Sequence, residues 1–406
     1  MRMVATARHS SLAAVCIAVT GCGEDGGASG AAVVVRDSAG VTIVENPALG
    51  AQADLGWGVG PGPSFDIGAL EGPDAYQLFR VRDALRLPDG RVAVLDGGSA
   101  EVRVFGPDGS HLATWGGQGE GPGEFMQPTA LASWPGDSLA VWDNRLRRLT
   151  VMDPHGALGR ALTIAAAEGM EAPAFSHVLD DGRLVVVSPS LLGSEPWNGL
   201  RRIPVRVAVL HPDGTLAADL GEHPGQETFM RVGEGSIEIM RLTFARGYAV
   251  SGAGDETLIA PNDRLELRYW DATGALTRVV RIARPPRLVT EADRAAELER
   301  RLTGAPEQAR PGIRRAFEEF PGPDTLPAFS EAGTDTQGYT WVRPFRTAAD
   351  TGRERWIVLD PEGVALGTVE LPEGIDVYEI GADYVLGRWA DELGVEHVRM
   401  WPLTGR

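Results

Sequence analysis

The stretch Leu87–Phe125, LPDGRVAVLDGGSAEVRVFGPDGSHLATWGGQGEGPGEF, sets the pattern that the rest of the chain repeats. Its segments Arg91–Leu95 and Glu101–Phe105 are alternating or continuously apolar, as short strands are. Each is preceded or followed by a turn tripeptide of proline, aspartate and glycine, in which glycine supplies the positive φ that a tight turn needs. The stretch therefore predicts short antiparallel strands joined by tight turns.

An outer hairpin of this kind recurs along the chain, at Val102–Trp115, Leu149–Ile164, Val207–Leu220, Leu267–Ile282 and Trp356–Leu371. A sixth begins at His397–Leu403, and its missing outer strand can come from Pro63–Leu70 near the other end of the chain. Inner segments recur once per hairpin, from Ala84, Ala130, His177, Arg241, Ala332 and Tyr378. The repeats predict an all-β fold, a six-bladed β-propeller of four-stranded blades, closed by an N-terminal strand that covers the exposed sheet edge.

Composition agrees with many short strands and excludes several functions. The 406 residues include 52 glycines and 28 prolines, and 43% are hydrophobic, which is enough to bury a core. Every one of the 38 basic residues is arginine, so Schiff-base chemistry and a P-loop lysine are both excluded. The formal net charge of −18 argues against a nucleic-acid partner, which would need a basic face.

Residues 1–21 have the form of an export signal. Arg2 and Arg8 precede the short apolar run Ser11–Val19, and Val19-Thr20-Gly21-Cys22 resembles the lipobox of bacterial lipoproteins. We expect cleavage before Cys22, lipid attachment at Cys22, and a flexible leash over residues 22–32 that tethers the protein to the membrane by its lipid alone. The alternative is an ordinary secretory signal with a chance cysteine. Gly23 favours the outer membrane of the cell envelope as the destination.

The segments VVVRDSAGVTIVENP (Val33–Pro47) and GEGPGEF (Gly119–Phe125) carry a family resemblance. Together they resemble bacterial six-bladed β-propeller lipoproteins related to the NHL-repeat propellers. The resemblance implies fold and export, and it brings no catalytic residues because most members of that group have no assigned activity. On this basis residues 33–62 form an extra hairpin with its lead-in, and residues 63–406 form the propeller.

Loop length predicts which face of the propeller binds a ligand. Turns within the first and last strand pairs are all short, whereas middle turns and blade crossings hold Ser188–Ile203, Gly221–Ile237, Gly252–Arg264, Pro285–Pro327, Arg343–Arg355 and Trp389–Glu396. We expect a ligand to meet this elaborated face and its channel mouth.

The longest insertion, residues 285–327 in blade five, predicts two helices. Thr290 can cap the first with Asp293 at its third position, Gly304 ends it, and Gly312–Phe320 forms the second. The insertion is either a lid or a packed family insertion, and its apolar stripe favours packing.

Candidate ligand-binding residues come from the starts of the inner strands and are Arg80, Arg82, Gln127, His177, Arg241, Glu331 and Glu379. This mixed, arginine-rich set suits an anionic or sugar-like ligand better than a metal, so we expect no cofactor, with Ca²⁺ as the alternative. A lone histidine such as His177 is more often packed than catalytic. Asp96 and Asp143 are expected to cap turns or pair with arginine, with Asn144 beside them.

Two functional hypotheses follow. The first is a non-catalytic binding or interaction scaffold, an envelope lipoprotein that binds a protein, peptide or glycan. The alternative is a metal-assisted hydrolase, lactonase or lyase with its site in the propeller channel. The first is favoured because the sequence contains no recognisable catalytic motif.

Overall fold

The computed structural model describes residues 32–50, 53–164, 170, 173–189, 195–233, 236–240, 242–320 and 322–406. The predicted signal peptide 1–21, Cys22 with nearly all of the leash, and the candidate residue Arg241 lie outside the described residues. Within the described ranges the chain is mainly β, which confirms the all-β prediction.

The described strands form six sheets; five contain at least four strands in chain order, and the sixth contains three, completed by strands from near the N-terminus. The first sheet contains β5 (Val81–Arg86), β6 (Val92–Asp96), β7 (Glu101–Phe105) and β8 (His111–Gly116); the second β9 (Pro128–Trp134), β10 (Ser138–Asp143), β11 (Arg148–Met152) and β12 (Leu158–Thr163); the third β13 (Ala174–Val178), β14 (Leu184–Pro189), β15 (Gly199–Leu210), β16 (Leu216–Gly233) and β17 (Ser236–Met240). The fourth contains β18 (Tyr248–Ala253), β19 (Glu256–Pro261), β20 (Glu266–Asp271) and β21 (Leu276–Ile282); the fifth β22 (Phe329–Thr334), β23 (Thr340–Pro344), β24 (Arg355–Leu359) and β25 (Ala365–Glu370); the sixth β26 (Asp376–Ile380), β27 (Tyr384–Ala390) and β28 (Glu396–Thr404).

Each innermost strand lies beside the innermost strand of the next sheet. Contacts join β5 to β9, β9 to β13, β13 to β18, and β18 to β22, and β26 returns to β5. The fifth and sixth sheets meet where the Thr336 N–H donates to the Ile380 carbonyl, 3.1 Å away. Sheets arranged radially around a common axis in this way form a β-propeller.

The hydrophobic core is divided among the interfaces between successive sheets. Val102 of the first sheet packs with Leu139 of the second, and Val358 of the fifth packs with Val385 of the sixth, all four almost fully buried. The second strand of every sheet is buried along nearly its whole length, because it is covered by sheets on both sides. Continuous apolar runs such as Val92–Leu95 are explained by this double burial.

Segments from near both ends of the described chain pair with each other in the sixth sheet. Short strands β3 (Gly58–Val59) and β4 (Phe65–Ile67) both pair antiparallel with β28, and Phe65 lies opposite Met400. The segment Pro63–Leu70, expected as an outer strand, thus contains the strand that pairs there. A 3₁₀ helix, Asp74–Tyr76, leads from β4 towards β5.

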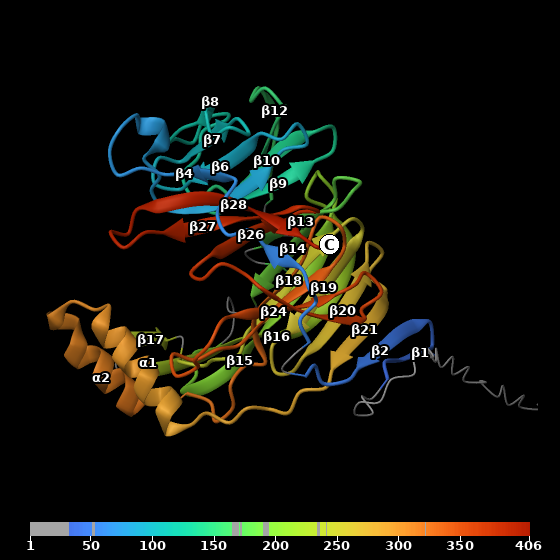
Figure 1. Ribbon diagram of the computed structural model, residues 1–406, viewed down its shortest axis with the longest axis vertical. Coiled ribbons are helices and arrows are strands. Elements are labelled where there is room, and N and C mark those ends of the chain that lie inside the picture. Colours follow the sequence, from blue (N-terminus) through green and yellow to red (C-terminus); the bar gives the residue numbers. More distant parts are fainter. Residues whose placement is uncertain are drawn as a thin grey trace, which may run out of the picture.

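The segment Val33–Pro47 forms a hairpin of β1 (Val34–Ser38) and β2 (Val41–Asn46), which extends the fourth sheet (Figure 1). Its strand β2 runs parallel to β21, and Val44 is buried in the core shared by the fourth and fifth sheets. The hairpin therefore lies at the outer edge of one sheet and does not cover an end of the channel.

The predicted positions of the first two strands of the fourth sheet were wrong. Gly252–Arg264 was taken as an elaborated middle turn, but it contains β19, which pairs with β18 across a tight turn at Gly254. Tyr248–Ser251 therefore belongs to the innermost strand, and the Ala245-Arg246-Gly247 tripeptide precedes that strand. Small residues in Ser251–Gly254 weakened the strand signal, and pairing with the buried strand β19 outweighed it.

The insertion between β21 and β22 forms α1 (Glu291–Thr303), a short 3₁₀ turn (Glu307–Ala309) and α2 (Arg310–Glu319). Thr290 and Asp293 make the expected reciprocal capping contacts, and Gly304 follows the last turn of α1. Figure 1 shows both helices beside the projecting ends of β15 and β17. In the part of the chain that the structure describes, no helix has both the length and the apolar content needed to cross a membrane.

Candidate functional site

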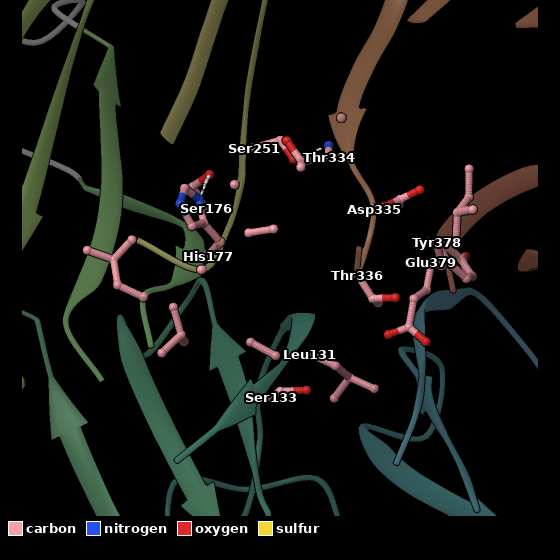
Figure 2. Close-up of a pocket in the computed structure, with 18 of the residues that line it drawn as sticks. Leu131, Ser133, Ser176, His177, Ser251, Thr334, Asp335, Thr336, Tyr378 and Glu379 are labelled. Carbon is pink, nitrogen blue, oxygen red and sulfur yellow. Dashed lines mark hydrogen bonds between the residues drawn. The ribbon is translucent and has the colours of Figure 1, made fainter. Parts of the chain in front are cut away.

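A cavity of about 940 Å³ lies on the axis of the ring, among the innermost strands. Residues of β9, β13, β18, β22 and β26 line it, together with the short turns that follow these strands and β5. Figure 2 shows side chains from several sheets around this space, among them Ser133, Ser251 and Glu379. We call it the channel cavity. It opens towards the face of the short first turns, whereas the sequence favoured the opposite, elaborated face.

The wall of the channel cavity combines hydroxyl and carboxyl groups. The hydroxyl-bearing lining residues are Ser133, Ser138, Ser176, Ser251, Ser330, Thr334 and Thr336, with Tyr248 and Tyr378, and the acidic ones are Asp137, Asp180, Glu331, Asp335 and Glu379. Among the described lining residues there is no arginine. The cavity thus offers many hydrogen-bond donors and acceptors without a guanidinium to bind an anion.

His177 joins the third and fourth sheets through a chain of polar contacts. The Ser176 hydroxyl donates to the Val250 carbonyl at 3.3 Å and lies 3.1 Å from His177 Nδ1, while the Thr257 hydroxyl lies 3.3 Å from Nε2. Burial lowers the pKa of His177 to about 4, so the ring is neutral at physiological pH. The contacts suit a ring that donates through Nδ1 and accepts at Nε2. Both nitrogens have partners, and His177 acts here as a packed, bridging residue.

Glu379 and Asp83 are two carboxyl groups at the junction of the sixth and first sheets. Asp83 accepts from the backbone N–H groups of Ala84 at 2.9 Å and Leu131 at 2.8 Å. Burial raises the pKa of Asp83 to about 7, and the charge of Glu379 adds to the rise. Burial likewise raises the pKa of Glu379. These acids retain protons at a pH where ordinary carboxyl groups have lost them.

Two further acids of the cavity wall are held by arginine. Arg343 donates to Glu331 at 2.7 Å. The buried Asp335 accepts from the Trp341 indole at 2.7 Å and forms an ion pair with Arg406 at 3.0 Å. Their charges are therefore compensated within the protein, which lowers the demand for a bound cation.

The structure brings three of the seven predicted ligand-binding residues to the channel cavity, namely His177, Glu331 and Glu379. The others do not line it. Arg80 and Arg82 are exposed near the start of β5, where the Arg80 guanidinium lies over the Phe79 ring, and Gln127 is exposed before β9. Arg241 lies outside the described residues. Ligand binding by this set stays a prediction.

Asp96 and Asp143 fix the middle turns of the first two sheets. Asp96 accepts from the backbone N–H of Phe79 at 3.1 Å and of Gly98 at 2.9 Å, and it pairs with Arg103 at 3.4 Å. Asp143 accepts in the same way from Gln127 and Arg145. Both side chains are buried, so they cap turns as expected. The exposed Asn144 donates its backbone N–H to the Gln127 carbonyl.

No group of three or more His, Cys, Asp or Glu side chains in the described ranges is placed to hold a metal ion. The acids nearest the channel axis are instead bound to backbone N–H groups or to arginine.

A second cavity, of about 560 Å³, lies on the elaborated face beneath α1. Polar lining residues include Gln226, Asn262, Glu297, Arg300, Arg301 and Arg346. Arg300 and Arg301 are both engaged by Glu297, at 2.6 and 3.0 Å. This cavity is smaller than the channel cavity, and its arginines already have partners, since Arg346 donates to the backbone carbonyls of Asp350 and Gly352.

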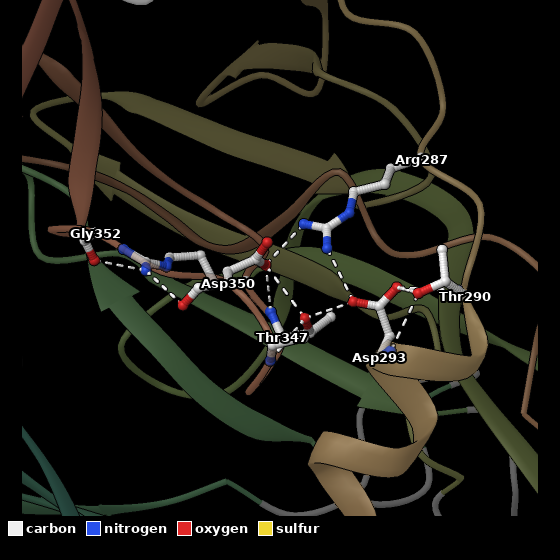
Figure 3. A network of polar contacts seen from close by, with 8 residues as sticks. Arg287, Thr290, Asp293, Thr347, Asp350 and Gly352 are labelled. Atoms are coloured by element: carbon white, nitrogen blue, oxygen red, sulfur yellow. Dashed lines mark hydrogen bonds and ion pairs between the residues drawn. The ribbon is translucent and has the colours of Figure 1, made fainter.

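A polar network fastens the N-terminus of α1 to the loop after β23 (Figure 3). Asp293 accepts from Thr347 at 2.6 Å and from Arg287 at 2.9 Å, and Arg287 also donates to Asp350 at 2.7 Å. Beyond α2, the Phe320 ring packs on Phe229 of β16 at 4.7 Å between ring centroids. The sequence assigned the insertion that contains Phe320 to blade five, whereas the aromatic partner of Phe320 belongs to the third sheet.

Sequence reasoning missed Asp83 and the hydroxyl groups that face the channel. Single serines and threonines in apolar strands form no motif, and Asp83 was passed over in favour of its arginine neighbours. Strict alternation offered no signal for Asp83 either, because a β-bulge between Val81 and Asp83 shifts the register of β5 and places Val81 with Ala84 in the same core cluster.

No family model matches the chain, and no curated protein matches it in sequence. Among solved structures, it is similar to a Bacteroides fragilis protein described as a candidate exported protein, at 12% identity and a TM-score of 0.50, over 89% of this chain and 99% of that one. It is also similar to a Xanthomonas campestris gluconolactonase (13% identity, TM-score 0.39, 81% and 87%) and to a Staphylococcus aureus virginiamycin B lyase (10%, 0.41, 88% and 98%). At these identities the likeness concerns the fold alone.

Proposed function

We propose that the protein is an exported binding protein of the bacterial cell envelope whose channel cavity takes an uncharged, hydroxyl-rich ligand of the saccharide class. The observation that carries this proposal is a cavity of about 940 Å³ whose described wall presents hydroxyl groups from several sheets and no arginine. Hydroxyl groups donate and accept hydrogen bonds, so they match the hydroxyl groups of a sugar without requiring charge. The proposed ligand class is thus narrower than the one predicted from the sequence, which included anionic as well as sugar-like ligands.

In this proposal the six sheets are the blades of a six-bladed propeller, closed by β4, with α1 and α2 as the helical insertion of blade five. The N-terminal pattern around Cys22 supports export and lipid anchoring, with the outer membrane as the destination. The similar Bacteroides fragilis protein is itself described as a candidate exported protein, which is in keeping with export of this chain. Replacing Cys22 by alanine should move the protein from the membrane fraction to the soluble fraction of the envelope, and retention in the membrane would contradict the anchor.

Titration calorimetry with cellobiose, chitobiose, maltose and the anionic digalacturonate tests the ligand class. We expect a neutral disaccharide to bind, digalacturonate to bind more weakly, and Ser133→Ala to weaken binding by about fivefold to tenfold, the effect of one lost hydrogen bond. Thr114→Ala on the outer strand β8 is the matched control and should bind as the unaltered protein does.

A turnover assay with sugar lactones, with and without Ca²⁺, distinguishes the alternative, a metal-assisted hydrolase, lactonase or lyase. Calcium-dependent turnover of a sugar lactone, abolished by EDTA, would replace the binding proposal with the enzyme. Absence of heat with every neutral disaccharide, together with binding of digalacturonate, would contradict the proposed ligand class.

A further inference from the structure

Glu379 differs from the other acids of the channel cavity in how its two oxygens are used. Its Oε1 accepts from the Tyr384 hydroxyl and from the Arg86 backbone N–H, the latter at 3.2 Å. Among the described residues its Oε2 has no hydrogen-bond partner, and the side chain lines the cavity (Figure 2). One oxygen is thus fixed by the protein, while the other is available to a ligand.

This asymmetry decides where a proton on Glu379 would lie. An oxygen that accepts two hydrogen bonds is the carbonyl-like oxygen of a protonated carboxyl group, so the proton belongs on Oε2. The group then presents an O–H donor to the cavity. Glu331, by contrast, is bound by Arg343 at 2.7 Å and stays an acceptor.

The surroundings of Glu379 favour the protonated form. Burial raises its pKa, and the hydrogen bonds from Tyr384 and Arg86 oppose that rise without cancelling it. The titratable and charged groups that act on Glu379 are Tyr384 and Arg86, and its charge acts on Asp83. One step further out, Asp383 acts on Tyr384, and Arg388, Asp376 and Glu396 act on the neighbouring Tyr378. The guanidinium of Arg86 is drawn towards Asp383, at 3.3 Å, and lies over the Tyr384 ring.

Resting on the function proposed above, we propose that Glu379 is the specificity-determining donor of the channel cavity, whose Oε2–H binds an uncharged acceptor oxygen of the ligand. Ether and carbonyl oxygens of a saccharide are such acceptors, because they carry no hydrogen that could be donated to a carboxylate. Loss of the proton leaves a carboxylate that repels these oxygens, so affinity should fall as pH rises.

Dicyclohexylcarbodiimide tests the protonated donor without any knowledge of the ligand. This apolar reagent reacts with protonated, water-poor carboxyl groups: the acid proton moves to one nitrogen, the carboxyl oxygen adds to the central carbon, and nothing leaves. The full protein is treated over a series of pH values, and its peptides are examined by mass spectrometry. We expect an adduct at Glu379 that declines as pH rises, and none at Glu331. The variant Glu379→Gln should lose that adduct.

Two outcomes would overturn the proton assignment: no adduct at Glu379 at mildly acidic pH, or equal labelling of Glu379 and Glu331. As a second measurement, infrared spectra of the unaltered protein and of Glu379→Gln should differ by one protonated carboxyl band. Failure of every disaccharide to bind would contradict the proposed function and leave the labelling result intact, so the two failures can be told apart.

The role in binding is tested by paired variants with whichever disaccharide binds. Glutamine keeps an acceptor for Tyr384 and Arg86 and a neutral N–H donor towards the cavity, so Glu379→Gln should bind within about threefold of the unaltered protein and lose the pH dependence. Glu379→Ala should weaken binding by about tenfold. Equal affinity of the alanine variant, or a pH profile unchanged in the glutamine variant, would contradict the donor role.

Discussion

At the scale of single residues, the channel holds buried groups whose pKa values move in opposite directions. Burial favours the neutral form of any group, so it lowers the pKa of His177 and raises the pKa of Asp83. Neutral groups can remain in the channel wall without counter-ions. In the channel wall these neutral groups stand beside Glu331 and Asp335, whose charges are compensated by arginine.

Asp83→Asn should change how stability depends on pH. The folded pKa of Asp83 is about 7 against 3.8 for the free side chain, so between these values the folded state binds more protons than the unfolded state. Stability contributed by this group therefore falls as pH rises from about 4 to about 7, with a slope of at most about 1.4 kcal/mol per pH unit. Urea unfolding across this range should show that fall in the unaltered protein and a flatter profile in the variant. Parallel profiles would contradict the shifted pKa.

Gly252→Ala should destabilise the protein through His177. A Cβ added at Gly252 would lie 2.2 Å from His177 Nε2 and 2.4 Å from the Glu256 carbonyl oxygen, distances at which atoms must move. We expect a loss of about 1–3 kcal/mol in the free energy of unfolding. The matched control is Gly333→Ala on β22, where the added Cβ would lie 3.5 Å from Ser251 Oγ, an ordinary contact. Equal losses in the two variants would show that the clash is not the cause.

At the scale of elements, α1 is held more firmly than a lid that must open. Burial opposes ionisation of Asp293, but hydrogen bonds from Thr347 and Thr290 and the charge of Arg287 outweigh it and hold the pKa at about 2. The carboxylate therefore stabilises the helix N-terminus as a cap and as the centre of a network. The insertion is in this respect a fixed part of the elaborated face.

Asp293→Ala should loosen α1 and leave the sheets intact. We expect a loss of about 1–3 kcal/mol, because the cap is lost and Arg287 and Thr347 lose a partner. Hydrogen exchange should speed up over Glu291–Thr303 and stay unchanged in β5–β8. The folded pKa lies below the free value of 3.8, so this contribution is complete above about pH 4 and is lost as pH falls towards 2. Glu299→Ala on the exposed face of α1 is the control and should change neither measurement.

At the scale of the whole molecule, stability depends on closing the ring between two distant parts of the chain. Phe65 and Ile67 of β4 are buried against Val398 and Met400 of β28, more than 300 positions later. The same cluster includes Val92 and Leu386, so it joins the first sheet to the sixth. Without it the sixth sheet would expose both an apolar face and an unpaired edge.

Phe65→Ala should weaken the whole ring. Loss of a buried phenylalanine costs about 3–5 kcal/mol, and at this junction we expect the urea midpoint of the entire cooperative transition to fall. Asp66→Ala on the same strand is the control, since its partners His397 and Arg399 form surface ion pairs worth at most about 1 kcal/mol. A change restricted to β28, with the remaining sheets unaffected, would contradict a closed and cooperative ring.

The sequence alone determined the β-rich repeat, the outer hairpins and the capped helix, because these depend on local patterns: alternating apolar residues, glycine at positive φ, and a threonine three residues before an aspartate. The sequence did not predict the strand within Gly252–Arg264. The small residues of Ser251–Gly254 weakened the strand signal, and the strand forms through pairing with its neighbours.

The channel cavity was decided by the tertiary structure. Its wall is assembled from short pieces of five innermost strands and from the turns beside them, so no contiguous segment contains the site. Arg80 and Arg82 are exposed near the start of β5 and outside the cavity wall, while Ser133, Ser251 and Glu379 converge from the second, fourth and sixth sheets. The raised pKa of Glu379 likewise depends on burial, which only the folded ring provides, while Tyr384 and Arg86 oppose the rise.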